Sequence, residues 1–237
     1  MRMYHLPPHA FACLTGRHCL FLDLRRNGYF SVPRQAMEEL IPWIRNWPSI
    51  QNNAPTLTTR LSDTATTLAT ELMARGMLTE ALTESPVVPR MAPAAEDDLE
   101  SMPLTDPAPL PRFLLRNVAL ALLYSDWTLR ILSIARIVDA VAKNKRSRAN
   151  VAQTDWTKTG HMARMFHKYR PLFPRDYLCL FDSLALVRFL SRYDLYPDWV
   201  FGVQEAPFSA HCWVQAGAVV LNDHLDNVSG YTPIMTV

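Results

Sequence analysis

The chain has 237 residues, of which 49% are hydrophobic and 19% charged, so we expect a packed core rather than a disordered chain. The formal net charge of +2 argues against a strong electrostatic field for nucleic acid. Four cysteines are too few for a small disulfide-stabilised scaffold, and the first residues lack the basic-then-apolar pattern of a secretory signal. We therefore expect a cytoplasmic protein with free thiols, in which Cys13 and Cys19 are small buried hydrophobic residues.

The N-terminal third shows the alternation of three short strands followed by helices. Residues 9–32 contain three apolar runs, separated at Gly16 and at Asn27-Gly28, where an Asn-Gly pair is a signal for a two-residue hairpin. Two helices are expected next, over residues 33–46 and from Asp63 as N-cap to a C-terminal glycine at position 76. A last short strand can follow in the run MLTEAL.

This order predicts a small winged-helix-like module over residues 1–83. Its second helix is nearly uncharged, which argues against the usual DNA-reading role of such modules. An exposed strand edge beside an apolar helix can instead accept an extended peptide as an added strand. The alternative is that the module only packs against the rest of the chain.

The middle of the chain begins with a proline-rich stretch. Residues 84–111 combine many prolines with acidic side chains, which predicts an extended linker and a domain boundary. Residues 112–142 then form one long, well-buried helix or two, with Ser125-Asp126 as the candidate break. Charged residues within this apolar run make it a poor membrane span. The basic stretch 143–150 is typical of a solvated loop, or alternatively of a patch for an acidic partner.

A cysteine is expected near the start of an apolar helix in the C-terminal third. Pro174 and Asp176 indicate a helix start, with Asp176 as N-cap, and helical apolar spacing runs from Leu180 to Val187. Cys179 then lies in the first turn, where unpaired backbone N–H groups and the helix dipole favour a thiolate. Its own backbone N–H is available to a developing oxyanion. The alternative is a buried structural cysteine.

Two predicted strands downstream supply a histidine and an aspartate. A two-residue loop at 216–217 between these strands would pair His211 with Asn222. A three-residue loop at 216–218 pairs His211 with Asp223 instead, and we expect this second arrangement. A carboxylate opposite the histidine orients the imidazole, which can take a thiol proton and later protonate a leaving amine. Cys179, His211 and Asp223 are therefore the predicted catalytic residues of a thiol acyl transfer.

A zinc site is the alternative use of these side chains, with Cys179, His211, Cys212 and His224 as ligands. Residues 211 and 212 are adjacent on a predicted strand and point to opposite faces, and the close chelating pair of a structural zinc site is missing. We therefore expect no metal. Other groups that could orient the histidine are Asn222, Asp226 and Asn227.

A set of short motifs gives residues 112–237 a family resemblance: Cys179-Leu180, Ser183 to Leu186, Gly202-Val203, Pro207-Phe208, Ala210-His211, Trp213-Val214 and Leu221 to Asp223. Together they resemble the lasso peptide biosynthesis B protein, a leader peptidase with a transglutaminase-like (papain-like) fold. The resemblance implies an α+β protein in which residues 112–237 are the cysteine peptidase domain. It also implies that Cys179 is the nucleophile, His211 the base and Asp223 the orienting acid.

The N-terminal third resembles, in its layout, the PqqD-like recognition element of peptide-modifying systems. In that family the leader peptide adds to the third strand and lies against the third helix, which here correspond to Gly28–Val32 and Asp63–Arg75. The side chains that this resemblance suggests for leader contact are Tyr29, Phe30, Leu68 and Leu72.

The resemblance also implies two partners: the leader of a ribosomally made precursor peptide, and a separate asparagine synthetase-like cyclase that closes a macrolactam with ATP. No Gly-rich phosphate loop is present, so we expect neither nucleotide nor other cofactor in this chain. The run before Cys179 lacks the glutamine of papain-like proteases, which leaves Arg175 or a backbone N–H as second oxyanion donor. Two other functions stay open: a different thiol acyl transfer, such as transglutamination, or a non-catalytic docking chaperone for the cyclase.

Overall fold

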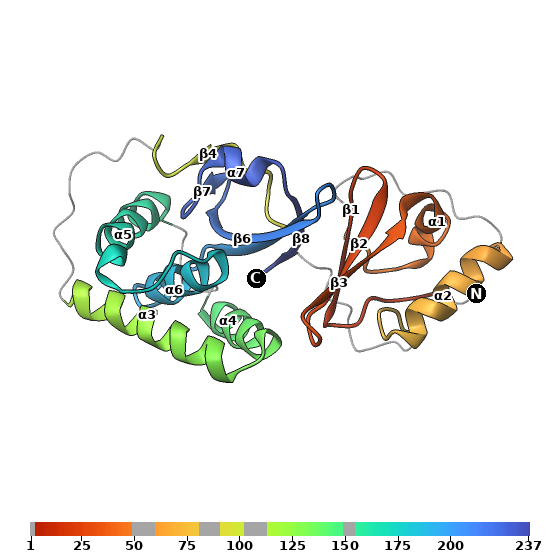
Figure 1. Ribbon diagram of the computed structural model, residues 1–237, viewed down its shortest axis with the longest axis horizontal. Helices are drawn as coiled ribbons and strands as arrows, with labels where there is room; N and C mark the ends of the chain where they lie inside the picture. Colours follow the sequence, from red (N-terminus) through yellow and green to blue (C-terminus); the bar gives the residue numbers. More distant parts are fainter. Residues whose placement is uncertain (1–2, 49–59, 81–90, 102–112, 149–154) are drawn as a thin grey trace. The chain divides into compact units, whose positions relative to one another are not determined.

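The computed structural model describes residues 3–48, 60–80, 91–101, 113–148 and 155–237 (Figure 1). The chain divides into two compact units. The first unit comprises Met1–Met91 with Val203–Ser209 and Thr232–Thr236, and the second comprises Ala92–Gly202 with Ala210–Tyr231 and Val237. The fold is mixed α and β, as expected.

The first unit contains the three predicted strands, β1 (Ala10–Leu14), β2 (His18–Asp23) and β3 (Gly28–Pro33), in an antiparallel sheet of order β1-β2-β3. The prediction of a two-residue hairpin at Asn27-Gly28 is wrong, because Asp23 pairs with Gly28 and four residues form the loop. Asn27 has a positive φ of 49° and ends this loop, a conformation that asparagine tolerates better than most residues.

Two helices and a 3₁₀ turn cover this sheet. The helix predicted over 33–46 ends early, as α1 (Arg34–Glu38), and a 3₁₀ turn, η1 (Ile41–Trp43), follows. Pro42 in that turn has no N–H and disfavours α geometry in the residue before it, so the helix cannot continue. The second helix is α2 (Asp63–Ala74), whose N-cap is Ser62 rather than the predicted Asp63.

The hydrophobic core of the first unit lies between the sheet and these helices. Phe21 of β2 is fully buried and stacks on Phe30 of β3 with ring centroids 5.0 Å apart. Leu40 and Leu72 pack into the same cluster. The predicted strand after α2 is reduced to a single bridge between His5 and Thr79 within the described residues.

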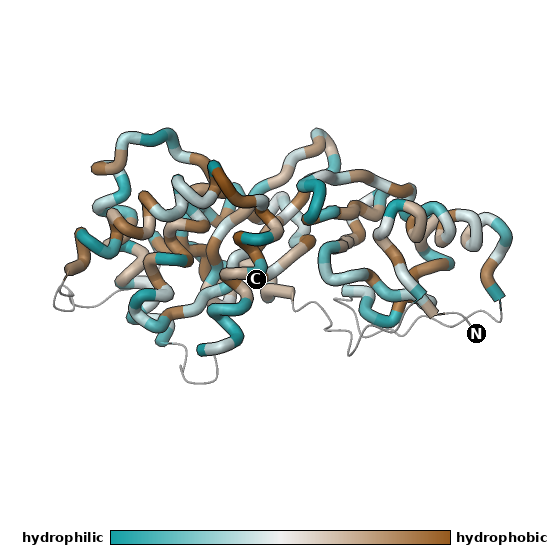
Figure 2. Tube along the Cα trace, turned by 90° about the horizontal axis from the view of Figure 1, so that it is seen from below, coloured by the Kyte–Doolittle hydropathy of each residue, from teal (hydrophilic) through white to brown (hydrophobic). Residues whose placement is uncertain are grey.

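The second unit contains the longer helices: α3 (Leu114–Ile131), α4 (Ile134–Arg148), α5 (Trp156–Tyr169), the 3₁₀ turn η2 (Arg170–Leu172), α6 (Cys179–Ser191) and α7 (Leu225–Ser229). Along them the colour in Figure 2 alternates between hydrophobic and hydrophilic, as expected for helices with one buried face. Among the described residues, no helix has the length and hydropathy needed to cross a membrane.

Two boundaries in this helical region differ from the sequence predictions. The long apolar run breaks after Ile131, and Ser125 stays inside α3 because its hydroxyl and that of Thr128 accept hydrogen bonds from Arg188. The basic stretch predicted as a loop continues α4 to Arg148. Cations in the last turn of a helix favour its negative end, which explains why the helix extends through them.

The five-stranded sheet has the order β4-β7-β6-β5-β8. Its strands are β4 (Asp97–Asp98), β5 (Asp198–Gln204), β6 (Ser209–Ala216), β7 (Val219–Val220) and β8 (Thr232–Thr236). β4 falls inside the stretch predicted as a linker and pairs in parallel with β7. The Asp98 carboxylate accepts a hydrogen bond from the Leu225 N–H at 3.1 Å, so residues 92–101 belong to the second unit. The rest of the predicted linker, over 84–90 and 102–111, lies outside the described residues.

Candidate active site

Cys179 is the first residue of α6, as predicted, and its side chain is exposed. The prediction of Asp176 as the N-cap is wrong. The N-cap is Leu178, whose side chain makes no capping hydrogen bond. The Leu178 N–H instead donates to Asp182, one turn further along the helix, at 2.7 Å. Eight of the thirteen residues of α6 are buried, so the body of the helix is fixed in the core while its first residue remains accessible.

His211 lies on β6, and its Nε2 is 2.6 Å from Oδ2 of Asp223. The other carboxylate oxygen of Asp223 accepts hydrogen bonds from the His224 N–H and the Asn227 side chain, both at 2.8 Å. These contacts fix the carboxylate, which in turn fixes the imidazole. With Nε2 engaged, Nδ1 is the ring nitrogen left for other chemistry.

The predicted strand register is nevertheless wrong. Gln215 pairs with Val220, so Gly217 and Ala218 form a two-residue loop, and extrapolation of the ladder does not place Asp223 opposite His211. β7 ends at Val220, and the chain bends so that Asp223 approaches the histidine from beyond the end of the strand. Gly217 has a φ of +62°, in the left-handed region that favours glycine.

A chain of hydrogen bonds connects the three segments that carry the predicted catalytic residues. The Ser183 hydroxyl, one turn after Cys179, donates to the Cys212 carbonyl at 3.0 Å and accepts from Asn222 at 2.9 Å. The Asn222 side-chain oxygen accepts from the Val214 N–H at 2.6 Å. Cys212 adjoins His211 in sequence, and Asn222 adjoins Asp223. This network ties α6, β6 and the segment after β7 together.

Aromatic rings hold the imidazole of His211 in place. The Trp213 ring lies 6.1 Å from it in a stacked orientation, and the Tyr231 ring lies 5.3 Å from it. A Cβ at Gly202 would meet the Trp213 ring at 2.7 Å and Tyr231 at 2.9 Å, so only glycine fits on β5 at this point. Trp213 itself is 2% exposed and belongs to the core.

Electrostatics favour an ion pair between the thiol and the imidazole. Hydrogen bonds to the Cys212 side chain and then to His211 lower the pKa of Cys179 to about 4, against the opposing effect of burial. Hydrogen bonds to Asp223 and then to Cys179 raise the pKa of His211 to about 9. The hydrogen bond to Cys179 and burial raise the pKa of Cys212, so Cys212 stays a neutral thiol. Between these two pKa values, Cys179 is a thiolate beside an imidazolium.

The other two cysteines lack this environment. Cys13 and Cys19 lie on β1 and β2, are 5% and 0% exposed, and form no disulfide. Burial raises the pKa of both thiols. They are the buried hydrophobic residues that the sequence predicts.

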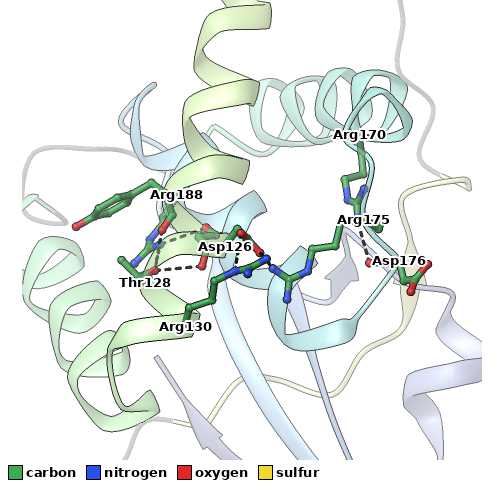
Figure 3. Close-up of polar contacts among 9 residues, drawn as sticks. Asp126, Thr128, Arg130, Arg170, Arg175, Asp176 and Arg188 are labelled. Atoms are coloured by element: carbon green, nitrogen blue, oxygen red, sulfur yellow. Dashed lines mark hydrogen bonds and ion pairs between the residues drawn. The ribbon is translucent and has the colours of Figure 1, made fainter.

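Arg175, one candidate for the second oxyanion donor, is engaged elsewhere. Its guanidinium forms an ion pair with Asp126 of α3 (Figure 3). The same guanidinium lies 4.4 Å over the Phe181 ring. Sequence reasoning missed Arg170 and Asp182, which contact each other beside the start of α6. A single aspartate in the otherwise apolar first turns of that helix was the signal that could have identified this pair.

A separate groove of about 640 Å³ lies in the first unit between β3 and α2. Three of the four predicted leader-contact residues line it: Phe30, Leu68 and Leu72. Leu72 is 1% exposed and can contribute only to the floor. Tyr29 lies outside this groove, in a neighbouring cavity of the same unit, with its ring 5.6 Å from that of Phe208. Arg75 extends over the Phe30 ring at 5.2 Å.

Comparison with known families adds one result. Residues 119–236 match the model of the transglutaminase-like superfamily. This part of the chain is a transglutaminase-like domain. The superfamily generally comprises cysteine proteases and acyltransferases, so the match supports a thiol-dependent peptidase or acyl-transfer activity. The matched segment of the transglutaminase-like domain contains Cys179, His211 and Asp223. No curated protein and no solved structure shows a significant match.

The thiolate–imidazolium pair makes a prediction about pH. The rate of Cys179 alkylation by iodoacetamide should rise through about pH 4, where an ordinary thiol would rise near pH 9. His211→Gln removes the hydrogen-bonding cation, so the pKa of the thiol rises and alkylation at pH 6 should fall roughly tenfold or more. Peptide mapping by mass spectrometry identifies the labelled cysteine. Cys13 and Cys19 serve as internal controls and should stay unlabelled, whereas a wild-type limb near pH 9 would contradict the assignment.

Proposed function

We propose that this protein is a leader peptidase of lasso peptide biosynthesis, which binds the leader of a ribosomally made precursor peptide and cuts it from the core. The observation that carries the proposal is the Cys179 thiolate beside His211, with Asp223 at the other ring nitrogen, inside a transglutaminase-like domain. The resemblance of the motifs in residues 112–237 to the lasso peptide B protein supports this choice of substrate class among thiol acyl transfers. The groove in the first unit supplies a place for the leader.

The proposed reaction begins with attack of the Cys179 sulfur on the carbonyl carbon of the last leader residue. The backbone N–H of Cys179, in the first turn of α6, has no intrahelical partner and can stabilise the oxyanion. The His211 imidazolium donates its Nδ1 proton to the amine of the core, which leaves. A water molecule, deprotonated by His211, then hydrolyses the thioester and releases the leader.

Leader binding in this proposal uses the edge of β3. β3 is the last strand of the sheet β1-β2-β3, so an extended peptide can pair with its backbone. Side chains on one face of the added strand would enter the groove against Phe30 and Leu68. The charged residues of the groove are Asp63, Glu71 and Arg75, two acids and one base, beside a larger set of apolar side chains, so the main selection is for apolar leader side chains. The cyclase is the proposed recipient of the released core.

Cleavage of a candidate precursor peptide encoded near this protein tests the proposal. Mass spectrometry should show a single cut between leader and core with the wild-type protein and none with Cys179→Ala. Cys13→Ala, which removes a buried thiol in the first unit, is the matched control and should cut normally. If neither protein cuts, with or without the cyclase, the peptidase proposal is wrong. A product joined to an added amine rather than water would indicate acyl transfer instead.

The groove makes a second prediction. Leu68→Glu places a charge among apolar groove residues, so the affinity for a fluorescent leader peptide should fall by roughly tenfold or more in an anisotropy titration. Thr70→Glu, on the same helix but outside the groove and exposed, is the control and should leave the affinity unchanged. Equal affinity for both variants would exclude this groove as the leader site.

A further inference from the structure

Arg170 is a buried arginine whose hydrogen bonds converge on the segment leading to Cys179. Its side chain is 1% exposed. Nε donates to the Asp182 carboxylate, Nη1 to the Phe173 carbonyl at 3.2 Å, and Nη2 to the carbonyls of Arg175 and Asp176, each at 3.1 Å. Figure 3 shows the guanidinium pointing at this segment. A single side chain therefore binds three backbone carbonyls in the run just before the nucleophile.

Two aromatic rings enclose the same guanidinium. Tyr177 lies 4.4 Å and Phe181 lies 5.2 Å from its central carbon. Burying a cation costs several kcal/mol unless its charge and donors are satisfied, and here a carboxylate, three carbonyls and two ring faces satisfy them. Residues 173–182 are thus wrapped around one arginine.

Asp182 links this arginine to the nucleophile. One carboxylate oxygen accepts from Arg170, and the other accepts from the N-cap N–H of Leu178. Asp182 is three residues after Cys179 on α6, so the two side chains are neighbours on the helix surface. An unpaired carboxylate about one helical turn from a thiolate would disfavour it, and the Arg170 charge offsets that effect.

We propose that Arg170 is a positioning residue for Cys179. It fixes the backbone that precedes the nucleophile, and it neutralises Asp182 so that this carboxylate can hold the N-cap of α6 without opposing the thiolate. The inference deepens the proposed function, because it concerns the same thiol, but the first test below needs no peptide substrate.

The other titratable groups around the thiol determine how the test is read. His211 and Cys212 face Cys179 from β6, with Asp223 behind the histidine. Asp182 adjoins it on its own helix, with Arg170 of η2 bonded to that carboxylate and His167 of α5 interacting with it electrostatically. A change in the pH profile must therefore be compared between variants that alter only one of these charges at a time.

The test is the pH dependence of Cys179 alkylation by iodoacetamide in the full-length protein. Arg170→Gln should move the acid limb to higher pH by roughly one unit or more, because Asp182 is left unneutralised. Adding Asp182→Asn to that variant should return the limb to the wild-type position. Asp182→Asn alone should move it to lower pH, and this variant keeps the test informative if Arg170→Gln does not fold.

Arg188 provides the matched control. It is also an embedded arginine, bonded to the Thr128 hydroxyl at 2.6 Å and stacked on Tyr124 at 4.4 Å, but none of these contacts reaches the 173–178 segment (Figure 3). Arg188→Gln should lower the melting temperature as Arg170→Gln does and leave the acid limb unchanged. An unmoved limb in folded Arg170→Gln, or the same shift in Arg188→Gln, would overturn the proposal.

Arg170→Lys separates the two parts of the role. Lysine keeps the charge but cannot reach three carbonyls and a carboxylate with a planar fork. The alkylation limb should stay at its wild-type pH, while kcat for precursor cleavage falls at least roughly tenfold with little change in KM. Wild-type kcat in this variant would refute the backbone-fixing part. If the wild-type protein does not cut the precursor at all, the proposed function fails, whereas the charge inference still stands on the alkylation profiles.

Discussion

The proposed chemistry of this chain depends on a buried serine. Ser183 is fully buried, and its hydroxyl donates to a carbonyl on β6 while accepting from Asn222. A buried hydroxyl left without partners costs about 1–3 kcal/mol, so this network selects the arrangement in which all of its members bond. Each member stands beside one of the proposed catalytic residues: one helical turn from Cys179, one residue from His211 and one residue from Asp223. The packing of α6 on the sheet that contains β6 therefore aligns a thiol, an imidazole and a carboxylate.

The second unit also sets the charges around these three residues, through the positions of its helix ends and its buried polar groups. The apolar helix α6 exposes its first residue, where free N–H groups favour a thiolate. Polar groups buried nearby are paired: the Asp182 carboxylate with Arg170 and a backbone N–H, and the Asp223 carboxylate with the imidazole and two further donors. The imidazolium then remains the cation available to the sulfur. The first unit adds an apolar groove without thiol chemistry, so in the proposed function recognition and reaction use different parts of the chain.

Local sequence patterns predicted much of the fold and of the candidate site. The predictions that failed did so for physical reasons. Alternating hydrophobicity identified β1 to β3, and helical spacing placed Cys179 in the first turn of its helix. The His211–Asp223 contact was also expected, but the register that was meant to produce it was wrong, because the short strand β7 ends and the chain bends back. Asp176 failed as an N-cap since a longer-range acceptor, Asp182, satisfies the Leu178 N–H. The sequence pattern did not predict β4, because its acidic, proline-flanked residues lack a strand signal and its pairing with β7 comes from tertiary contacts.

In the proposed function, Cys179 forms a covalent bond to the leader during cleavage. Intact-mass spectrometry of the full-length protein, mixed with a candidate precursor peptide and quenched in acid at short times, detects such a bond. We expect a transient protein species heavier by the leader minus one water, mapped to Cys179, with free core appearing no later than free leader. Cleavage without any adduct on Cys179, or an adduct that carries the core instead of the leader, would contradict it.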